Sequence, residues 1–304
     1  MLTTTFIDVN GVRLRVIDAG PDDGPVVVLA HGFPELAFSW RHQIPALAQA
    51  GYRVLAPDQR GYGGSSRPEQ VEAYDIAALT GDLVGLIDAV GAERAAIVGH
   101  DWGATVAWSV PLLHPDRVVA VAGFGDNFFY VLYFQQPGVA DTELAADPRE
   151  SMLRMLGGMR RPADEASATR MASRMLAPGP QGFVERLVEP ERLPHWLTET
   201  ELDYYAAEFS RTGFTGALNW YRNFDRNWEI MAHPVADTIL VPGLFVGGTD
   251  DPVLAFTRTD RAGEVAKGPY RQVMLDGAGH WIQQERADQV NTELLSFLSE
   301  SRWK

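Results

Sequence analysis

The ten residues from Ala95 to Ala104 constrain the fold of this chain more than any other stretch. They read Ala-Ala-Ile-Val-Gly-His-Asp-Trp-Gly-Ala, a short apolar run followed by a turn that contains two glycines. A helical run from Ala104 to Leu113 comes next. This order predicts a buried strand, a sharp turn and a helix, with Asp101 at the centre of the turn.

Asp101 occupies the position at which the strand-turn-helix elbow of an esterase carries its nucleophilic Ser. A Ser that attacked a saturated carbon would leave an ether, which water does not readily cleave. A carboxylate that attacks the same carbon leaves an ester, whose carbonyl is open to hydrolysis. The Asp therefore indicates an electrophilic sp3 carbon as the target. The alternative is that Gly99 and Gly103 only allow a tight turn, as in any doubly wound protein.

Length and composition fit one α/β domain that carries an insertion. The 304 residues, 46% of them hydrophobic and 22% charged, suffice for one large core. With no Cys in the sequence, disulfides and thiolate sites are excluded. The net charge of -14 argues against nucleic-acid and anionic-membrane partners, which require a basic surface. The sequence shows neither a signal-peptide pattern nor a membrane-spanning run, so we expect a cytoplasmic protein.

Hydrophobic patterning predicts the order of the strands and helices. Alternating residues on both sides of Asn10-Gly11 predict a hairpin of two antiparallel edge strands, 4–9 and 12–17. Continuous apolar runs and helical spacings then alternate, which predicts a mostly parallel sheet with helices on both faces. The further expected strands are 26–30, 53–56, the run before Gly99, 118–122, 238–246 and 271–275, and the expected helices are 40–50, 74–90 and 104–113.

This alternation stops after Gly123, where helical stretches rich in Met, Arg, Glu and aromatic residues replace it. We expect residues 128–233 to form a helical lid at the carboxyl edge of the sheet, and 1–127 with 234–304 to form the core domain. Five Met of the segment suit an adaptable pocket wall, although packing between helices is the commoner role. They are Met152, Met155, Met159, Met171 and Met175.

Polar residues follow several expected strands, at the edge where open α/β sheets bind ligands. After strand 26–30 comes His31-Gly32-Phe33-Pro34-Glu35, and the Phe33 N–H is expected to face Asp101 across the crevice. The two last strands are followed by Asp250-Asp251 and by Gly279-His280. The order nucleophile, acid, histidine is that of the α/β-hydrolase triad, which predicts a catalytic role for His280.

A glycine-rich run, residues 57–66, is the one stretch that invites a nucleotide-binding interpretation. It lacks the Lys-Ser/Thr ending of a P-loop, and its spacing does not match the dinucleotide pattern. We therefore expect a structural loop there, and no cofactor.

The chain also resembles the soluble epoxide hydrolases of the α/β-hydrolase superfamily over nearly its whole length. Several of the matching motifs are long and have no obvious packing role. They are His31-Gly32-Phe33-Pro34-Glu35, Asp58 to Pro68 (DQRGYGGSSRP), Gly99 to Ala104 (GHDWGA), Leu132 to Ala140 (LYFQQPGVA), Leu218 to Asn223 (LNWYRN) and Gly279-His280-Trp281.

The resemblance implies an α/β-hydrolase fold, a small apolar epoxide and water as reactants, and no metal or cofactor. It also implies a role for each of seven residues. These are Asp101 as nucleophile, His280 as base, Asp251 as its carboxylate partner, Tyr130 and Tyr221 as lid acids, and Phe33 and Trp102 as backbone donors of the oxyanion hole. Asp250 stays a rival of Asp251, because spacing does not choose between neighbours. A homodimer stays open as the oligomeric state.

Two other functions remain as alternatives. A haloalkane dehalogenase uses the same Asp elbow and triad, with Trp102 suited to bind halide. Phe33 removes one common second halide donor, an Asn after His-Gly, while Trp196, Trp220 and Trp228 leave a lid Trp available. Halide departs without a proton, so lid tyrosines would have no task there. The other alternative is a catalytically silent ligand-binding protein of the same fold.

Overall fold

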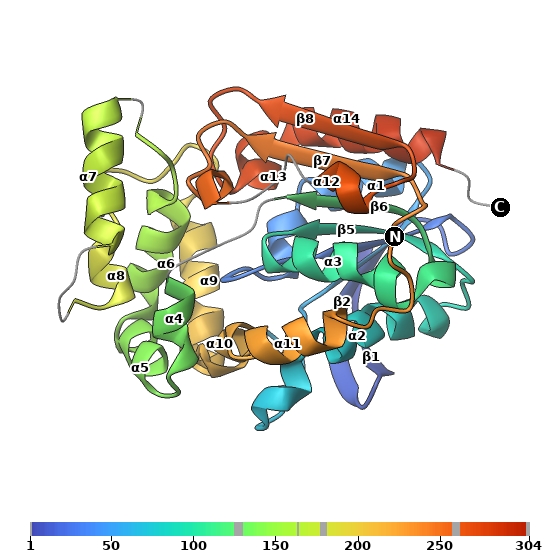
Figure 1. The fold of residues 1–304 in the computed structure, drawn as a ribbon, viewed down its shortest axis with the longest axis horizontal. Helices are drawn as coiled ribbons and strands as arrows, with labels where there is room; N and C mark the ends of the chain where they lie inside the picture. Colours follow the sequence, from blue (N-terminus) through green and yellow to red (C-terminus); the bar gives the residue numbers. More distant parts are fainter. Residues whose placement is uncertain (1, 125–129, 163, 177–180, 257–261, 302–304) are drawn as a thin grey trace.

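A twisted sheet of eight strands runs through the protein (Figure 1). The computed structural model describes residues 2–124, 130–162, 164–176, 181–256 and 262–301. The strand order in the sheet is β1-β2-β4-β3-β5-β6-β7-β8, with β1 antiparallel to β2, β2 antiparallel to β4, and the others parallel. The strands are β1 Leu2–Val9, β2 Val12–Ala19, β3 Val26–Ala30, β4 Arg53–Pro57, β5 Ala95–His100, β6 Val118–Phe124, β7 Gly243–Gly248 and β8 Tyr270–Leu275.

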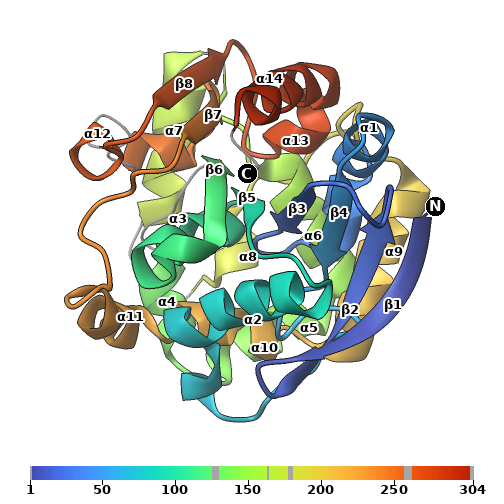
Figure 2. The same ribbon diagram turned by 90° about the vertical axis from the view of Figure 1, so that its right-hand side faces the viewer.

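Helices cover both faces of this sheet (Figure 2). One face carries α2 Ile76–Ala89 and α3 Trp102–Leu113, and the other carries α1 Gln43–Gln49, α13 Ile282–Glu285 and α14 Ala287–Glu300. Successive residues of β3 enter the two cores in turn, with Val28 packed toward α2 and α3, and Val27 toward α1 and α14. Since both faces are covered, the central strands are apolar throughout. The expected fold class, a mostly parallel α/β sheet, is confirmed.

The chain between β6 and β7 forms a set of helices beside the sheet (Figure 1). No strand occurs among its described residues, in line with the sequence pattern. The expected boundary between residues 127 and 128 lies outside the described residues. The helices are α4 Tyr130–Gln135, α5 Val139–Ala146, α6 Pro148–Gly158, α7 Glu165–Leu176, α8 Phe183–Arg186, α9 Glu199–Thr212, α10 Thr215–Tyr221 and α11 Phe224–Met231, while the short α12, Ala262–Val265, precedes β8.

Three expectations about the elements were wrong in detail. Of the two hairpin strands, only β1 lies at an edge of the sheet, because β2 also pairs with β4. The strand expected over 238–246 begins at Gly243, since Pro242 has no N–H for the ladder and Ile239 makes only an isolated bridge. The helix expected over 40–50 begins at Gln43, after the 3-10 turn Ala37–Trp40, with Pro45 in its first turn.

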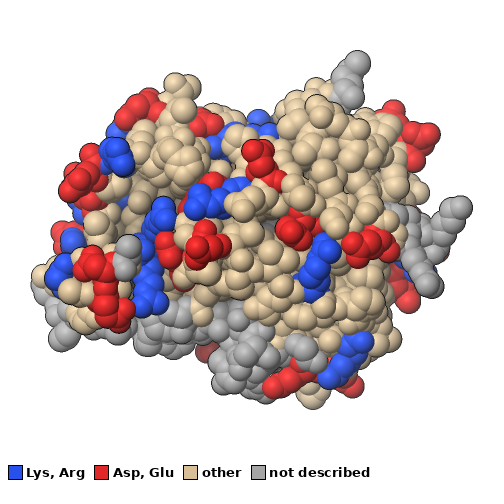
Figure 3. All heavy atoms as spheres, turned by 90° about the horizontal axis from the view of Figure 1, so that it is seen from above, with Lys and Arg blue, Asp and Glu red and all other residues tan. Residues whose placement is uncertain are grey.

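Charged side chains of both signs mix over the surface. On the face in Figure 3, acidic and basic residues are interspersed rather than gathered by sign. Several arginines of the helical segment form surface ion pairs, such as Arg154 with Glu189 at 2.8 Å. No helix among the described residues is both long and apolar enough to cross a membrane.

A buried ion pair fixes the loop after β4 to the rest of the fold. The guanidinium of Arg60 donates two hydrogen bonds to Asp82 on α2, at 2.8 and 2.6 Å, and a third to the carbonyl of Ala73. Both charged side chains are about one-twentieth exposed, at 6% and 4%. The carbonyl of Arg60 accepts a hydrogen bond from the indole of Trp220 on α10. The same residue therefore joins the core to the helical segment.

We expect Asp82→Ala to lower the free energy of unfolding by about 3–5 kcal/mol, because it leaves the buried Arg60 charge without its partner. Arg149→Ala is the matched control, since Arg149 pairs with Asp203 while both side chains are exposed, at 47% and 62%. That loss is expected to stay below about 1 kcal/mol. Urea unfolding followed by circular dichroism measures both changes. Equal small losses would contradict the anchoring role of the pair.

Candidate active site

The turn between β5 and α3 holds Asp101 in a strained backbone conformation. Its φ and ψ are 51° and -123°, a region that residues with a side chain rarely adopt. The crossing of strand and helix is so close that a Cβ on Gly99 would lie 2.0 Å from the carbonyl oxygen of Gly103. Glycine is therefore required at this contact. The turn places the Asp101 carboxylate at the carboxyl edge of the sheet, fully buried.

Backbone N–H groups bind the Asp101 carboxylate from two elements. Phe33 N–H, in the loop after β3, donates to Oδ1 at 2.8 Å. The N–H of Trp102, the first residue of α3, donates to the carboxylate as well. Gly32 lies against the same group, because a Cβ there would meet Asp101 Oδ1 at 2.5 Å. The two donors expected from the sequence thus lie beside Asp101.

His280 lies between two carboxylates. Its Nδ1 is 3.1 Å from Oδ2 of Asp251, and its Nε2 is 3.7 Å from Oδ2 of Asp101. Asp251 is oriented by the N–H of Val253, which donates to Oδ1 at 2.8 Å. Asp250 points elsewhere, since its carboxylate pairs with Arg160 at 3.1 Å. Of the two neighbouring acids, Asp251 is the one in contact with His280.

Burial and charge set the protonation of these groups. Burial raises the pKa of Asp101 above its usual value, while the charges of His280 and His100 and the backbone donors oppose that rise. For His280, burial favours a lower pKa, but the charge and hydrogen bond of Asp251, with Asp101 beyond, raise the pKa to about 9. The position of His280 between Asp251 and Asp101 therefore favours its protonated form in the resting site.

A second buried ion pair lies directly behind Asp101. His100 Nδ1 is 2.6 Å from Oε2 of Glu35, and His100 Nε2 is 2.9 Å from the carbonyl oxygen of His280. A carbonyl only accepts, and Glu35 also accepts from Gly32 N–H and from Gln283, so both ring nitrogens of His100 face acceptors. Although burial opposes ionisation, the charge of His100 lowers the pKa of Glu35 to about 2. The His100 ring is therefore held between Glu35 and the backbone of His280.

Sequence reasoning missed this pair, although both residues lie inside motifs that it singled out. His100 directly precedes Asp101, and Glu35 closes the His-Gly-Phe-Pro-Glu loop. A charged residue that follows a continuously buried strand was the available signal. A charge at such a place needs a partner of opposite sign nearby.

The two tyrosines meet above Asp101. Tyr221, the last residue of α10, is fully buried, and its ring lies 5.4 Å from that of Phe33 and 5.1 Å from that of Trp102. Tyr130, at the start of α4, packs its ring 5.8 Å from that of Tyr221. Burial, with Tyr130 and Asp101 close by, raises the pKa of Tyr221 well above its usual value. The Tyr221 hydroxyl has no hydrogen-bond partner with good geometry among the described residues.

One expectation concerned metal ions. Within the described ranges, no three His, Asp or Glu side chains group as metal ligands.

The five Met residues of the lid were considered for a pocket wall. Two of them, Met155 and Met159, line a small cavity together with His280 and Tyr130. Met152 instead packs in the core and is fully buried.

Comparison with known proteins places this chain in a family. Residues 25–287 match the model of the alpha/beta hydrolase fold family. Epoxide hydrolase A of Mycobacterium tuberculosis is 63% identical, with 98% of this chain and 97% of that protein covered. Two relatives of known structure share the fold.

The first is epoxide hydrolase A of Mycobacterium thermoresistibile, with a TM-score of 0.95 and 58% identity over the whole of both chains. The second is potato (Solanum tuberosum) epoxide hydrolase I, with a TM-score of 0.86, 31% identity and coverage of 99% of this chain and 100% of that one. The resemblance found in the sequence motifs is confirmed at this level. The chain belongs to the epoxide hydrolases of the alpha/beta hydrolase fold family.

Proposed function

We propose that this enzyme hydrolyses an epoxide to a vicinal diol through a covalent ester on Asp101. One observation carries the proposal: the Asp101 carboxylate has one oxygen fixed by the Phe33 N–H and the other directed toward His280. The fixed oxygen is suited to become an ester carbonyl. The other is suited to attack carbon.

In the first step, Asp101 Oδ2 attacks one oxirane carbon from the side opposite the ring oxygen. A C–O bond of the ring breaks, and the ring oxygen takes a proton from a phenol. Tyr130 and Tyr221 are the proposed donors, since both rings lie on the side of Phe33 and Trp102, next to the nucleophile. The negative charge passes from the Asp101 carboxylate to the phenolate of the donor, and a neutral hydroxyalkyl ester remains.

In the second step, neutral His280 removes a proton from water, and the resulting hydroxide adds to the ester carbonyl carbon. The negative charge that develops on Oδ1 is stabilised by the N–H groups of Phe33 and Trp102. The bond from that carbon to Oδ2 then breaks, and Oδ2 leaves with the diol. The two protons of the water, one of them carried by His280, go to this oxygen and to the phenolate left by the first step, which restores the resting enzyme. Asp251 orients the imidazole and stabilises its protonated form.

Residues 128–233 are the lid of this proposal. Tyr130 and Tyr221 come from that segment, and so do Met155 and Met159, which face His280 across the small cavity. The lid therefore supplies the proton donors, while the core domain supplies the nucleophile and the base.

A single turnover of excess enzyme in ¹⁸O-labelled water tests the covalent step. The diol of the first turnover is expected to carry unlabelled oxygen from Asp101, because water attacks the ester carbonyl and not the substrate carbon. Mass spectrometry of the diol and of the peptide that contains Asp101 follows the label. Label in the first diol would exclude the ester. Turnover of a haloalkane panel with halide release and no diol formation from epoxides would favour the dehalogenase alternative.

The hydrolysis step should accelerate with rising pH, because only neutral His280 accepts a proton. Ester formation removes the Asp101 charge, so the pKa of His280 in the ester is expected below the resting value of about 9. Asp251→Asn removes a second charge and should move the pH profile of hydrolysis further toward acid. Single-turnover rates over a pH series measure the shift. His280→Gln is the control, expected to accumulate the ester at every pH; a profile unmoved by Asp251→Asn would contradict the assignment.

The tyrosines should share the proton-donor role. Each single variant, Tyr130→Phe or Tyr221→Phe, is expected to keep reduced ring opening, since the other phenol still polarises the ring oxygen. The double variant should lose alkylation of Asp101 by about 100-fold or more. Single-turnover mass spectrometry gives the rate, and thermal unfolding checks the fold. A folded double variant that is alkylated at the parental rate would remove the tyrosines from the mechanism.

A further inference from the structure

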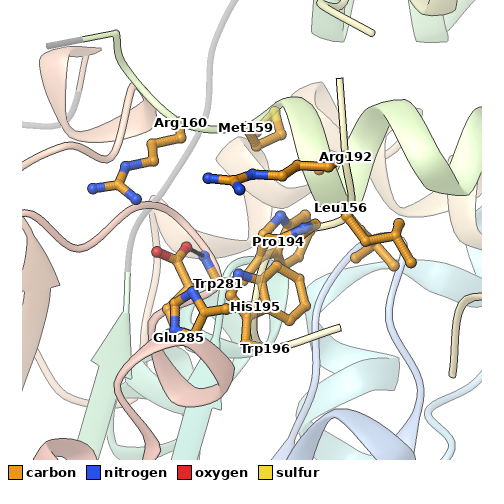
Figure 4. A pocket seen from close by; sticks show the side chains of 11 residues that line it. Leu156, Met159, Arg160, Arg192, Pro194, His195, Trp196, Trp281 and Glu285 are labelled. Carbon is orange, nitrogen blue, oxygen red and sulfur yellow. Dashed lines mark hydrogen bonds between the residues drawn. The ribbon is translucent and has the colours of Figure 1, made fainter. Parts of the chain in front are cut away.

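Two cavities meet at one wall beside the candidate active site. The inner cavity, of about 20 Å³, is lined by His280 and Tyr130 among others. The outer pocket, of about 510 Å³, lies between the helical segment and the loop after β8 (Figure 4). Two residues, Met159 and Trp281, line both. They form the wall between the catalytic side and the outer pocket.

The inner cavity is lined mostly by apolar side chains. Its volume leaves room for about one water, and a buried water needs two to four polar partners. Only His280 and Tyr130 bring polar side chains to its lining, and the rest is apolar: Phe33, Pro34, Met155, Met159, Phe183 and Trp281. An apolar carbon next to the oxirane matches this lining.

Trp281 is the fixed half of the wall. Its backbone N–H donates to Glu285 at 3.0 Å, its indole donates to the carbonyl of Met155 at 3.3 Å, and it is 1% exposed. Its ring also lies against that of His280, with centroids 4.6 Å apart. A movement of Trp281 would therefore displace the base.

Met159 is the adjustable half. Its carbonyl accepts from the N–H of His280 at 3.4 Å, and two residues later the N–H of Arg161 donates to the carbonyl of Asp250 at 2.8 Å. The backbone is thus attached to both catalytic loops. The side chain is unbranched and only half-buried, and a thioether chain changes rotamer easily.

The outer pocket is lined by both charged and apolar residues. Arg160 and Arg192 extend across it in Figure 4, and both are exposed side chains. The apolar residues of its lining, including Leu156, Pro194 and Trp196, provide surface along which an alkyl chain can pack. A chain that passed Met159 would therefore run over apolar surface toward water.

We propose that Met159 determines which epoxides this enzyme accepts, by controlling passage of the substrate's remote substituent from the inner cavity into the outer pocket. The proposal rests on the proposed function. It assigns the outer pocket to the alkyl part of terminal epoxides that are too long for the catalytic cavity. A short epoxide has no remote substituent that must pass Met159.

The test compares propylene oxide with decene oxide, which carries the same terminal oxirane on a long alkyl chain. Met159→Ala removes the adjustable half of the wall and is expected to raise the ratio of kcat/KM for the long over the short epoxide by about tenfold. Met159→Phe fills the same space with a rigid ring and is expected to lower that ratio by a similar factor. Diol formation measures the rates, and thermal unfolding verifies that each variant is folded.

Met155→Ala is the matched control, because Met155 lines the inner cavity but not the outer pocket. It enlarges the catalytic side without joining the two spaces, so the ratio should change less than about twofold. Equal ratios in wild type, Met159→Ala and Met159→Phe would overturn the inference, as would an equal rise in Met155→Ala. Absence of diol from either epoxide in the wild type would instead count against the proposed function.

Discussion

The site depends on one constraint, the full burial of the Asp101 carboxylate. A buried carboxylate is stable only where donors and positive charge replace water. The elbow meets that requirement by bringing the N–H of Phe33 to 2.8 Å from one oxygen and by placing Asp101 immediately before the first turn of α3. The glycine at position 99 and the strained backbone of Asp101 are consequences of the close approach that these contacts require. The turn motif thus supplies donors that offset part of the cost of burying this carboxylate.

Acidic and basic side chains alternate through the buried site. Asp251, His280 and Asp101 lie next to one another in that order, and His100, the chain neighbour of Asp101, pairs with Glu35. Each imidazole ring lies between acceptors on two sides, which makes the burial of the whole series less unfavourable. Ester formation on Asp101 would remove the charge of the middle member. His280 is then the group whose pKa is expected to fall most, because the charge of its direct neighbour Asp101 is lost.

Much of this arrangement could be predicted from the sequence, for identifiable reasons. A buried strand requires a continuous apolar run, and the tight turn after β5 requires glycines. Both are visible in a short stretch of sequence, so the parallel strands and the position of Asp101 were predictable. Other features depend on contacts between distant segments. The choice between Asp250 and Asp251 rests on Arg160, which pairs with the first, and the position of the His100 ring rests on the carbonyl of His280. Neither of these two contacts leaves a periodic pattern in the sequence. The start of β7 was predicted too early. The hydrophobic run includes Pro242 and the residues before it, but the strand begins only at Gly243.

The short connection after α6 has a consequence for motion. Through residues 159 to 161 the helical segment is bonded to the backbone of His280 and of Asp250, and the side chain of Arg160 adds contacts to Asp250 and to the carbonyl of Gly277. These backbone hydrogen bonds resist separation more than a contact made by side chains alone. If the helices rotate to admit a ligand, we expect the axis of the rotation to lie at residues 159 to 161. The helices farthest from these residues then move most, while His280 keeps its contact with Asp251.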